Sequence, residues 1–139
     1  MSDAAHRGAC LCGRVTVTVT GDLHAPDACH CRACRKSSGH YFVSTDVPRD
    51  RLDVTGADHV RWYASSDKVR RGFCGTCGTP LFWDPPARDW IGVAMGVFDG
   101  PTGTRIAVHV HVAEQGDYYP TPDDAPAYAT IPPRPDPAG

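Results

Sequence analysis

The sequence predicts a mainly β protein with little helix, on three observations. The run over residues 15–20, Val-Thr-Val-Thr-Val-Thr, alternates apolar and polar side chains with the period of a strand and is β-branched throughout. Further short apolar segments recur between glycine, proline and serine–aspartate turns. No stretch of ten residues carries a convincing helical period of apolar side chains.

Taken in order, the elements begin with a loose lead-in over residues 1–7 and a strand whose Val15, Val17 and Val19 share one face. A polar connection through Pro26 follows, and a short turn or one-turn helix ends at residues 36–39. We expect the next strand to start over residues 40–43 and later strands over residues 52–55, 60–63, 69–73, 81–83, 91–97 and 105–112.

The chain has the length of a single domain, 139 residues. Seven of its thirteen prolines lie in the last twenty residues. We therefore expect one domain over residues 1–131 and a proline-rich tail over residues 132–139.

Net charge and the first residues of the chain indicate which partners are disfavoured and in which compartment the protein is expected. The net charge of −2 gives no field that would recruit nucleic acid or an acidic membrane surface. No apolar run approaches the ~20 residues of a membrane span, and the start, Met-Ser-Asp-Ala-Ala-His-Arg, lacks the apolar core of a signal peptide. We expect a soluble, cytoplasmic protein.

Seven cysteines require an explanation. An odd count without an export signal argues against a disulfide framework, which leaves metal ligands, a redox centre or inert buried thiols. The cysteines form three groups along the chain: Cys10 and Cys12; Cys29, Cys31 and Cys34; Cys74 and Cys77.

The two cysteine pairs lie in short turns over residues 10–13 and 74–78, here called knuckles, and each knuckle ends in a glycine. A glycine at that position permits a positive φ and turns backbone N–H groups toward the sulfurs. Each knuckle also adjoins a predicted strand, so rigid elements would hold all four sulfurs. This pattern predicts one closed structural zinc site made by Cys10, Cys12, Cys74 and Cys77. The alternatives are buried core thiols, or a triad that recruits one of these cysteines.

The remaining group, here called the triad, consists of Cys29, Cys31 and Cys34. Its sulfurs suit a second zinc ion whose fourth position is held by water, a side chain or a substrate thiolate. His24, His30 and His40 are the local candidates for a fourth ligand, although the ring of His30, between two ligands, should point away from the metal. The alternative is a second closed site with three cysteines and one histidine.

Three thiolates give such a complex a charge of about −1, which makes the zinc a poor activator of water. An added thiol can instead bind as a thiolate, ready to attack a carbon electrophile. Three basic residues around the triad, Arg32, Arg35 and Lys36, would attract a thiol that bears carboxylates. Each of them taken singly is also explained as a solvated surface charge. Arg70 and Arg71 lead into Cys74 and are expected to steady the four-cysteine site.

The remaining residues that could take part in chemistry indicate no site beyond these two. His109 and His111 lie two apart on an expected strand and should share an ordinary polar face. Trp62, Trp83 and Trp90 are expected in the core. The sequence has no phosphate-binding glycine loop, nucleophile elbow or pair of catalytic carboxylates, and its one glutamate is Glu114.

Three motifs resemble the glutathione-dependent formaldehyde-activating enzyme family, which includes centromere protein V: Gly8-x-Cys10-x-Cys12-Gly13, Cys29-His-Cys31-Arg-Ala-Cys34-Arg35 and Arg71-Gly-Phe73-Cys74-Gly-Thr-Cys77-Gly78. The resemblance covers nearly the whole chain and includes all seven cysteines. It implies a β-tent fold of packed antiparallel sheets with two zinc ions, one structural and one catalytic, divided four plus three as above.

The activity that the resemblance implies is addition of glutathione to formaldehyde, which gives S-hydroxymethylglutathione. The resemblance thus implies a zinc-dependent carbon–sulfur lyase-type enzyme, whose expected partners are glutathione or a similar small thiol and a small aldehyde. The alternative is a non-catalytic zinc module that binds a protein partner or carries a thiol. A nucleic-acid-binding zinc ribbon would need a basic, aromatic-laced face, which the net charge disfavours.

Overall fold

The computed structural model describes residues 4–132. Apart from Pro132, the expected proline-rich tail lies outside the described residues. Within them the chain forms two compact units: the first contains residues 4–26 and 43–105, and the second contains residues 27–42 and 106–132. No helix of the described residues has the length and apolar character needed to cross a membrane.

The expectation of a mainly β protein with little helix is confirmed. The strands are β1 (Ala5–Ala9), β2 (Thr16–Thr20), β3 (Asp27–Cys29), β4 (Phe42–Pro48), β5 (Leu52–Thr55), β6 (Val60–Ala64), β7 (Arg70–Cys74), β8 (Pro80–Asp84), β9 (Trp90–Ala94) and β10 (Val108–Val110). The helices are α1 (Arg32–Ser38) and the 3-10 turns η1 (Arg49–Arg51), η2 (Ala57–His59), η3 (Met95–Val97) and η4 (Val112–Glu114).

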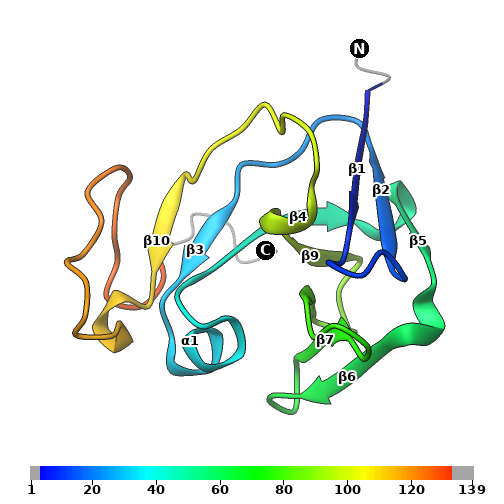
Figure 1. Cartoon of the computed structure of the whole chain (residues 1–139). Helices are drawn as coiled ribbons and strands as arrows, with labels where there is room; N and C mark the ends of the chain where they lie inside the picture. The colour runs from blue at the N-terminus through cyan, green and yellow to red at the C-terminus, as the bar shows by residue number, and fades with distance from the viewer. Residues whose placement is uncertain (1–3, 133–139) are drawn as a thin grey trace. The chain divides into compact units, whose positions relative to one another are not determined.

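The first unit is built from two antiparallel sheets. One has the order β1-β2-β5 (Figure 1), and the other contains β4-β9-β8-β7-β6. The valines of the alternating run, Val15, Val17 and Val19, are all buried, as their shared face predicts. Leu81 and Val93 are fully buried in the second of these sheets. Removal of these apolar side chains from water provides the main driving force for this unit.

Strand β1 corrects the expectation of a loose lead-in over residues 1–7. Its sequence, Ala-His-Arg-Gly-Ala, carries no strand-forming pattern, and it becomes a strand by pairing along β2, with Gly8 opposite Val17. Gly8 also bridges to Phe98, and a Cβ at this glycine would collide with the carbonyl oxygen of Val97. The strand therefore depends on its tertiary neighbours rather than on its own propensity.

Two expected strands are shorter than the sequence suggested. Strand β9 ends at Ala94, and the next three residues form the turn η3. Strand β10 ends at Val110 because His111 takes a left-handed conformation with φ of 58° and opens the turn η4. A single residue with positive φ reverses the chain direction and breaks the period of two.

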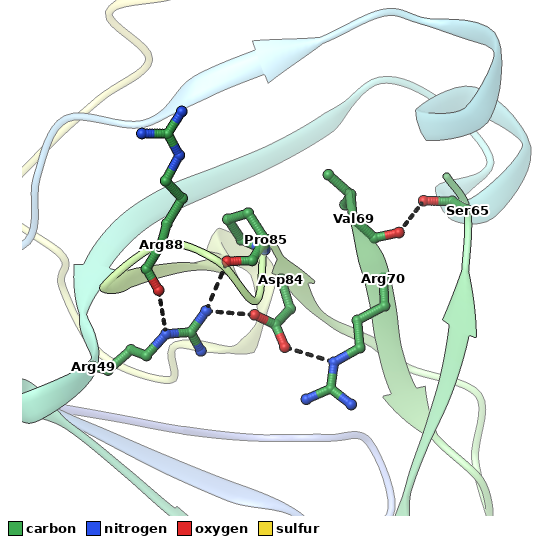
Figure 2. A network of polar contacts seen from close by, with 7 residues as sticks. All are labelled: Arg49, Ser65, Val69, Arg70, Asp84, Pro85 and Arg88. Carbon is green, nitrogen blue, oxygen red and sulfur yellow. Dashed lines mark hydrogen bonds and ion pairs between the residues drawn. The ribbon is translucent and has the colours of Figure 1, made fainter. Parts of the chain in front are cut away.

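The first unit also buries one carboxylate between two arginines (Figure 2). Asp84 at the end of β8 is 1% exposed and pairs with Arg49 at 2.6 Å and with Arg70 at 2.7 Å. Arg49 donates a further hydrogen bond to the carbonyl of Pro85, and the guanidinium of Arg70 lies 3.9 Å from the ring centroid of Trp62. Arg70 thus pairs with Asp84 and lies against Trp62, which corrects the expectation that it stabilises the four-cysteine site.

The tryptophans are less buried than expected. Trp62 is 38% exposed and stacks on Phe82, while Trp83 and Trp90 are half-buried and stack on each other. Their rings cover the sheet that contains β8 and β9 rather than filling its interior.

The second unit pairs β3 with β10 in parallel. The pairing continues past β3, where the N–H of His30 donates to the carbonyl of Val110 at 3.0 Å. A later segment around Ala127 also runs parallel to β10, where the N–H of Tyr128 donates to the carbonyl of His109 at 2.9 Å. The pairing of β3, β10 and this segment is parallel, so the strands of this unit are not antiparallel.

Helix α1 is longer than the one-turn element expected before residues 36–39. It begins at Arg32 because the sulfur of Cys31 accepts a hydrogen bond from the N–H of Cys34 and caps the first turn. It ends at Gly39, whose φ of 89° is the left-handed conformation typical of a helix C-terminus. A helix of seven residues shows no apolar period, so the sequence pattern did not reveal it.

Candidate functional site

The two knuckles of the first unit bring four sulfurs together. The Sγ atoms of Cys10, Cys12, Cys74 and Cys77 all lie within 4.8 Å of one another. Cys12 Sγ lies 3.6 Å from Cys10 Sγ and 3.8 Å from Cys74 Sγ, and all seven cysteines of the chain are free thiols. Four thiols at these separations match the ligand set of a tetrahedral zinc site.

Backbone geometry in the knuckles follows the expectation drawn from their glycines. Gly13 has φ of 81° and Gly78 has φ of 79°. The N–H of Val15 donates to Cys10 Sγ at 3.3 Å, and the N–H of Cys77 lies 3.5 Å from Cys74 Sγ. Inward-pointing N–H groups partly offset the negative charge of thiolates, so the knuckles are arranged to hold ionised sulfurs.

Two side chains that the sequence did not single out contact this cluster. The hydroxyl of Thr79 lies 3.2 Å from Cys77 Sγ and, with its backbone, lowers the pKa of that thiol to about 5. Backbone and side-chain hydrogen bonds from Arg14 lower the pKa of Cys12. Burial raises the pKa of Cys10. The exposed side of the cluster therefore carries thiolate character more readily than the buried side.

The triad forms the second group of sulfurs, and it lies within the second unit. The Sγ atoms of Cys29, Cys31 and Cys34 all lie within 4.8 Å of one another. Cys29 ends β3, Cys31 is the N-cap of α1, and Cys34 is buried in the first turn of that helix. The change from strand to capped helix over six residues is what brings these three side chains together.

Hydrogen bonding within the triad gives its thiols different pKa values. Hydrogen bonds from Cys29 and Cys34 strongly lower the pKa of Cys31, while the contacts of Cys29 with Cys31 and Cys34, together with burial, strongly raise the pKa of Cys29. Negative charge therefore collects on Cys31, because three thiolates at this separation repel one another. A soft dication would let all three ionise, so the donor set fits zinc.

The three basic residues predicted to surround the triad all lie on α1. Arg32 and Lys36 are exposed, and Arg35 is half-buried. The Nε atom of Arg35 is buried and has no hydrogen-bond partner among the described residues. The backbone N–H of Arg32 donates to the Glu114 carboxylate at 3.1 Å, so the one glutamate of the chain caps the helix that begins after Cys31 and contains Cys34.

His30 is not grouped with the triad sulfurs, and its ring is hydrogen-bonded to two other side chains. It is fully buried, and its Nδ1 lies 2.5 Å from Tyr119 Oη while its Nε2 lies 2.9 Å from His109 Nδ1. Both ring nitrogens are engaged, so His30 does not supply a fourth ligand in this conformation. Burial and the neighbouring His109 lower the pKa of His30 to about 4.

The other histidine candidates lie elsewhere. His40 is exposed and its Nδ1 lies 2.8 Å from Tyr118 Oη, while His24 is an exposed residue of the first unit. Among the described residues, neither cysteine group includes a histidine.

His109 and His111 correct the expectation of a shared polar face. His109 is fully buried on β10, and its Nε2 lies 2.8 Å from a carboxylate oxygen of Asp124. His111 lies beyond the strand in a left-handed conformation and is 33% exposed. The left-handed residue turns its side chain out of the period of two, so the two rings occupy different environments. The partners of His109 are 15 and 79 positions away, and no local pattern indicates them.

Comparison with known proteins gives a family. A family model described as glutathione-dependent formaldehyde-activating enzyme matches residues 5–114. A relative from Aspergillus flavus, whose name contains the same words, is 36% identical over 77 residues, which cover 52% of this chain and 40% of that protein. A Penicillium rubens relative with the same words in its name is 31% identical over 118 residues, which cover 78% of this chain and 62% of that protein.

Two further relatives extend the comparison. An uncharacterized lyase of Schizosaccharomyces pombe is 30% identical over 78 residues, which cover 56% of each chain. The matches to these curated relatives thus span 40% to 62% of their length. A crystal structure of a Rhodobacter sphaeroides protein aligns with a TM-score of 0.59 and 22% identity, covering 73% of this chain and 99% of that one, and shows the same fold. On its sequence match and its fold, the chain belongs to the family of glutathione-dependent formaldehyde-activating enzymes.

Proposed function

We propose that the chain is a zinc-dependent carbon–sulfur lyase-type enzyme that adds a small thiol, glutathione or an analogue, to formaldehyde or a related aldehyde at the triad. The observation that carries the proposal is the convergence of Cys29, Cys31 and Cys34, with no fourth ligand from the described residues. The names of its relatives support glutathione and formaldehyde as the substrates and a lyase as the type of enzyme.

In this proposal the triad sulfurs hold a zinc ion whose remaining position is open. When bound, zinc supplies a soft Lewis acid that lowers the pKa of an added thiol. The reaction forms one carbon–sulfur bond, opens the carbonyl π bond, and moves the thiol proton to the carbonyl oxygen. The protein's part is to present three sulfurs at fixed separation and to hold the thiol substrate in a reactive orientation.

Arg32, Arg35 and Lys36 are proposed to bind the carboxylates of the thiol substrate. Arg35 is the strongest candidate of the three, because its buried Nε has no partner among the described residues and a bound carboxylate would satisfy it. Arg32 and Lys36 are exposed, so their contributions would be smaller and more sensitive to salt.

The four-cysteine cluster is proposed to hold a structural zinc ion. Its sulfurs come from residues up to 67 positions apart, from Cys10 to Cys77, and four thiolates leave no open position for a substrate. Metal binding at such a closed site contributes directly to folding.

Zinc analysis of wild type and of Cys31→Ala, with and without glutathione, tests the proposal. We expect two zinc ions in wild type, one zinc ion in a folded Cys31→Ala, and loss of glutathione binding and turnover in the variant. Cys77→Ala is the matched control, since it should lose the other ion together with stability. Unfolding of Cys31→Ala would point to two structural sites, and glutathione binding without turnover would point to a thiol carrier.

The basic residues are tested by the kinetics of Arg35→Ala. A residue that binds the substrate carboxylate equally in ground and transition states raises KM and leaves kcat unchanged. Lys68→Ala, which removes an exposed charge from a turn of the first unit, is the control and should change neither constant. Unchanged KM in Arg35→Ala would remove this residue from the proposed substrate site.

A further inference from the structure

A chain of four hydrogen-bonded side chains runs through the second unit. Asp124 Oδ1 lies 2.8 Å from His109 Nε2, His109 Nδ1 lies 2.9 Å from His30 Nε2, and His30 Nδ1 lies 2.5 Å from Tyr119 Oη. Both histidines are fully buried, Tyr119 is half-buried and Asp124 is exposed. This row of hydrogen bonds thus connects the exposed Asp124 with His30, which lies between Cys29 and Cys31 of the triad.

The direction of each hydrogen bond in the network follows from Asp124, the exposed residue at its end. Asp124 is a carboxylate whose pKa is lowered by His109, so it accepts, and His109 Nε2 donates. A neutral His109 then accepts at Nδ1 from Nε2 of His30. A neutral His30 in turn accepts at Nδ1 from the hydroxyl of Tyr119. Every proton has one place, so each ring is held in one tautomer and one orientation.

Packing alone does not account for this network of hydrogen-bonded side chains. Two imidazole rings with no exposure cost desolvation that apolar side chains of similar size would avoid. A buried polar network in which every member is paired instead fixes one arrangement of the groups that it joins. The network joins three segments that the sequence separates widely: the loop after β3, the strand β10, and the loop over residues 115–124.

The middle residue connects the network to the site. His30 immediately follows Cys29, which ends β3, and immediately precedes Cys31, which caps α1. Fixing the ring of His30 restrains the backbone on both sides of it, and therefore the direction in which two of the three triad sulfurs point. We propose that Tyr119, His109 and Asp124 are positioning residues that set the geometry of the triad through His30.

This inference rests on the proposed function in one respect, which is that the triad binds a metal. Cadmium-113 NMR of the full chain loaded with cadmium tests it, because the resonance of a metal ion reports its own ligand geometry. Wild type should give two resonances, one for each cysteine group. The four-cysteine resonance serves as an internal reference, since the network touches none of its ligands.

Tyr119→Phe removes one hydroxyl from the network and keeps the ring. We expect the triad resonance to move or broaden, the four-cysteine resonance to stay, and the cadmium affinity of the triad to fall about tenfold. Tyr118→Phe is the matched control, because it removes a neighbouring hydroxyl that pairs with His40 outside the network, and it should leave both resonances in place. Asp124→Ala, a substitution of an exposed side chain, should reproduce the effect of Tyr119→Phe and decides the matter if that variant does not fold.

The outcomes separate the inference from the proposed function. Two wild-type resonances that both stay in place in Tyr119→Phe and Asp124→Ala overturn the inference and leave the metal site standing. Lower thermal stability with an unchanged triad resonance has the same meaning, because it assigns the network to folding alone. A single wild-type resonance overturns the metal site at the triad, and the inference with it.

Discussion

The hydroxyl of Thr79 accepts a hydrogen bond from the backbone N–H of Leu11 at 3.0 Å, across 68 positions of sequence. The same hydroxyl lies 3.2 Å from Cys77 Sγ and donates to that sulfur when it is ionised. The side chain directly after the second knuckle therefore hydrogen-bonds the backbone of the first knuckle and also contacts Cys77, a candidate metal ligand of the second.

Thr79→Val tests this link. The valine has nearly the same shape but no hydroxyl, so the Leu11 N–H loses its acceptor and Cys77 loses the side-chain hydrogen bond that lowers its pKa. We expect the zinc affinity of the four-cysteine cluster to fall about tenfold, measured by competition with a chelator. Thr79→Ser keeps the hydroxyl and should stay close to wild type. An equal loss in the serine variant would assign the effect to packing of the methyl group.

Asp84→Asn tests the buried carboxylate between Arg49 and Arg70. The neutral amide keeps the size of the side chain but removes the charge that both guanidinium groups share. The arginine side chains are 37% and 44% exposed, so solvent weakens the ion pairs, and we expect the free energy of unfolding to fall by about 2 kcal/mol.

Urea unfolding measures the effect of Asp84→Asn, with Asp67→Asn as the control. Asp67 is an exposed carboxylate in the turn before β7, and its substitution should change stability by less than about 0.5 kcal/mol. Equal unfolding free energies for wild type and Asp84→Asn would contradict the role given to this carboxylate.

Asp124 gives the second unit a specific dependence on pH. The hydrogen bond from His109 lowers the pKa of Asp124 below its ordinary value of 3.8, so the carboxylate stabilises the folded state above that value. This stabilisation is lost as the pH falls through the lowered folded-state pKa, because the folded protein then takes up the proton that the unfolded chain already holds.

We expect wild type to be more stable than Asp124→Asn at pH 6 and the two to become equally stable in acid once Asp124 is protonated in both states. Denaturant unfolding of both proteins at a series of pH values measures the difference, and acid effects on the cysteines cancel because both proteins share them. A difference that stays constant down to pH 3 would show that the carboxylate charge is not what His109 recognises.

Sequence patterns predicted the parts of the fold that local spacing encodes. The β-branched alternation gave a strand with Val15, Val17 and Val19 buried on one face. The glycine at the end of each knuckle predicted a positive φ, which both Gly13 and Gly78 have. The cysteine spacing within each pair and within the triad depended on the same kind of information, because a few intervening residues limit where a side chain can go. These features need no knowledge of distant neighbours.

Strands without such a pattern escaped prediction. β1 has no alternation and exists through its pairing with β2, and β3 is three residues long and exists through its pairing with β10. The end of β10 depends on the left-handed His111, a conformation that β propensity does not reveal. In each case tertiary contacts override or supply what local propensity lacks.

By itself, therefore, the sequence determined the local spacing of the cysteines, the mainly β character and the family. Tertiary structure alone decided what surrounds the sulfurs. Glu114 reaches the N-terminus of α1 across 82 positions, His109 reaches His30 across 79, and Thr79 reaches Leu11 across 68. Hydrogen bonds act over about 3 Å, and the folded path of the whole chain decides which residues come that close.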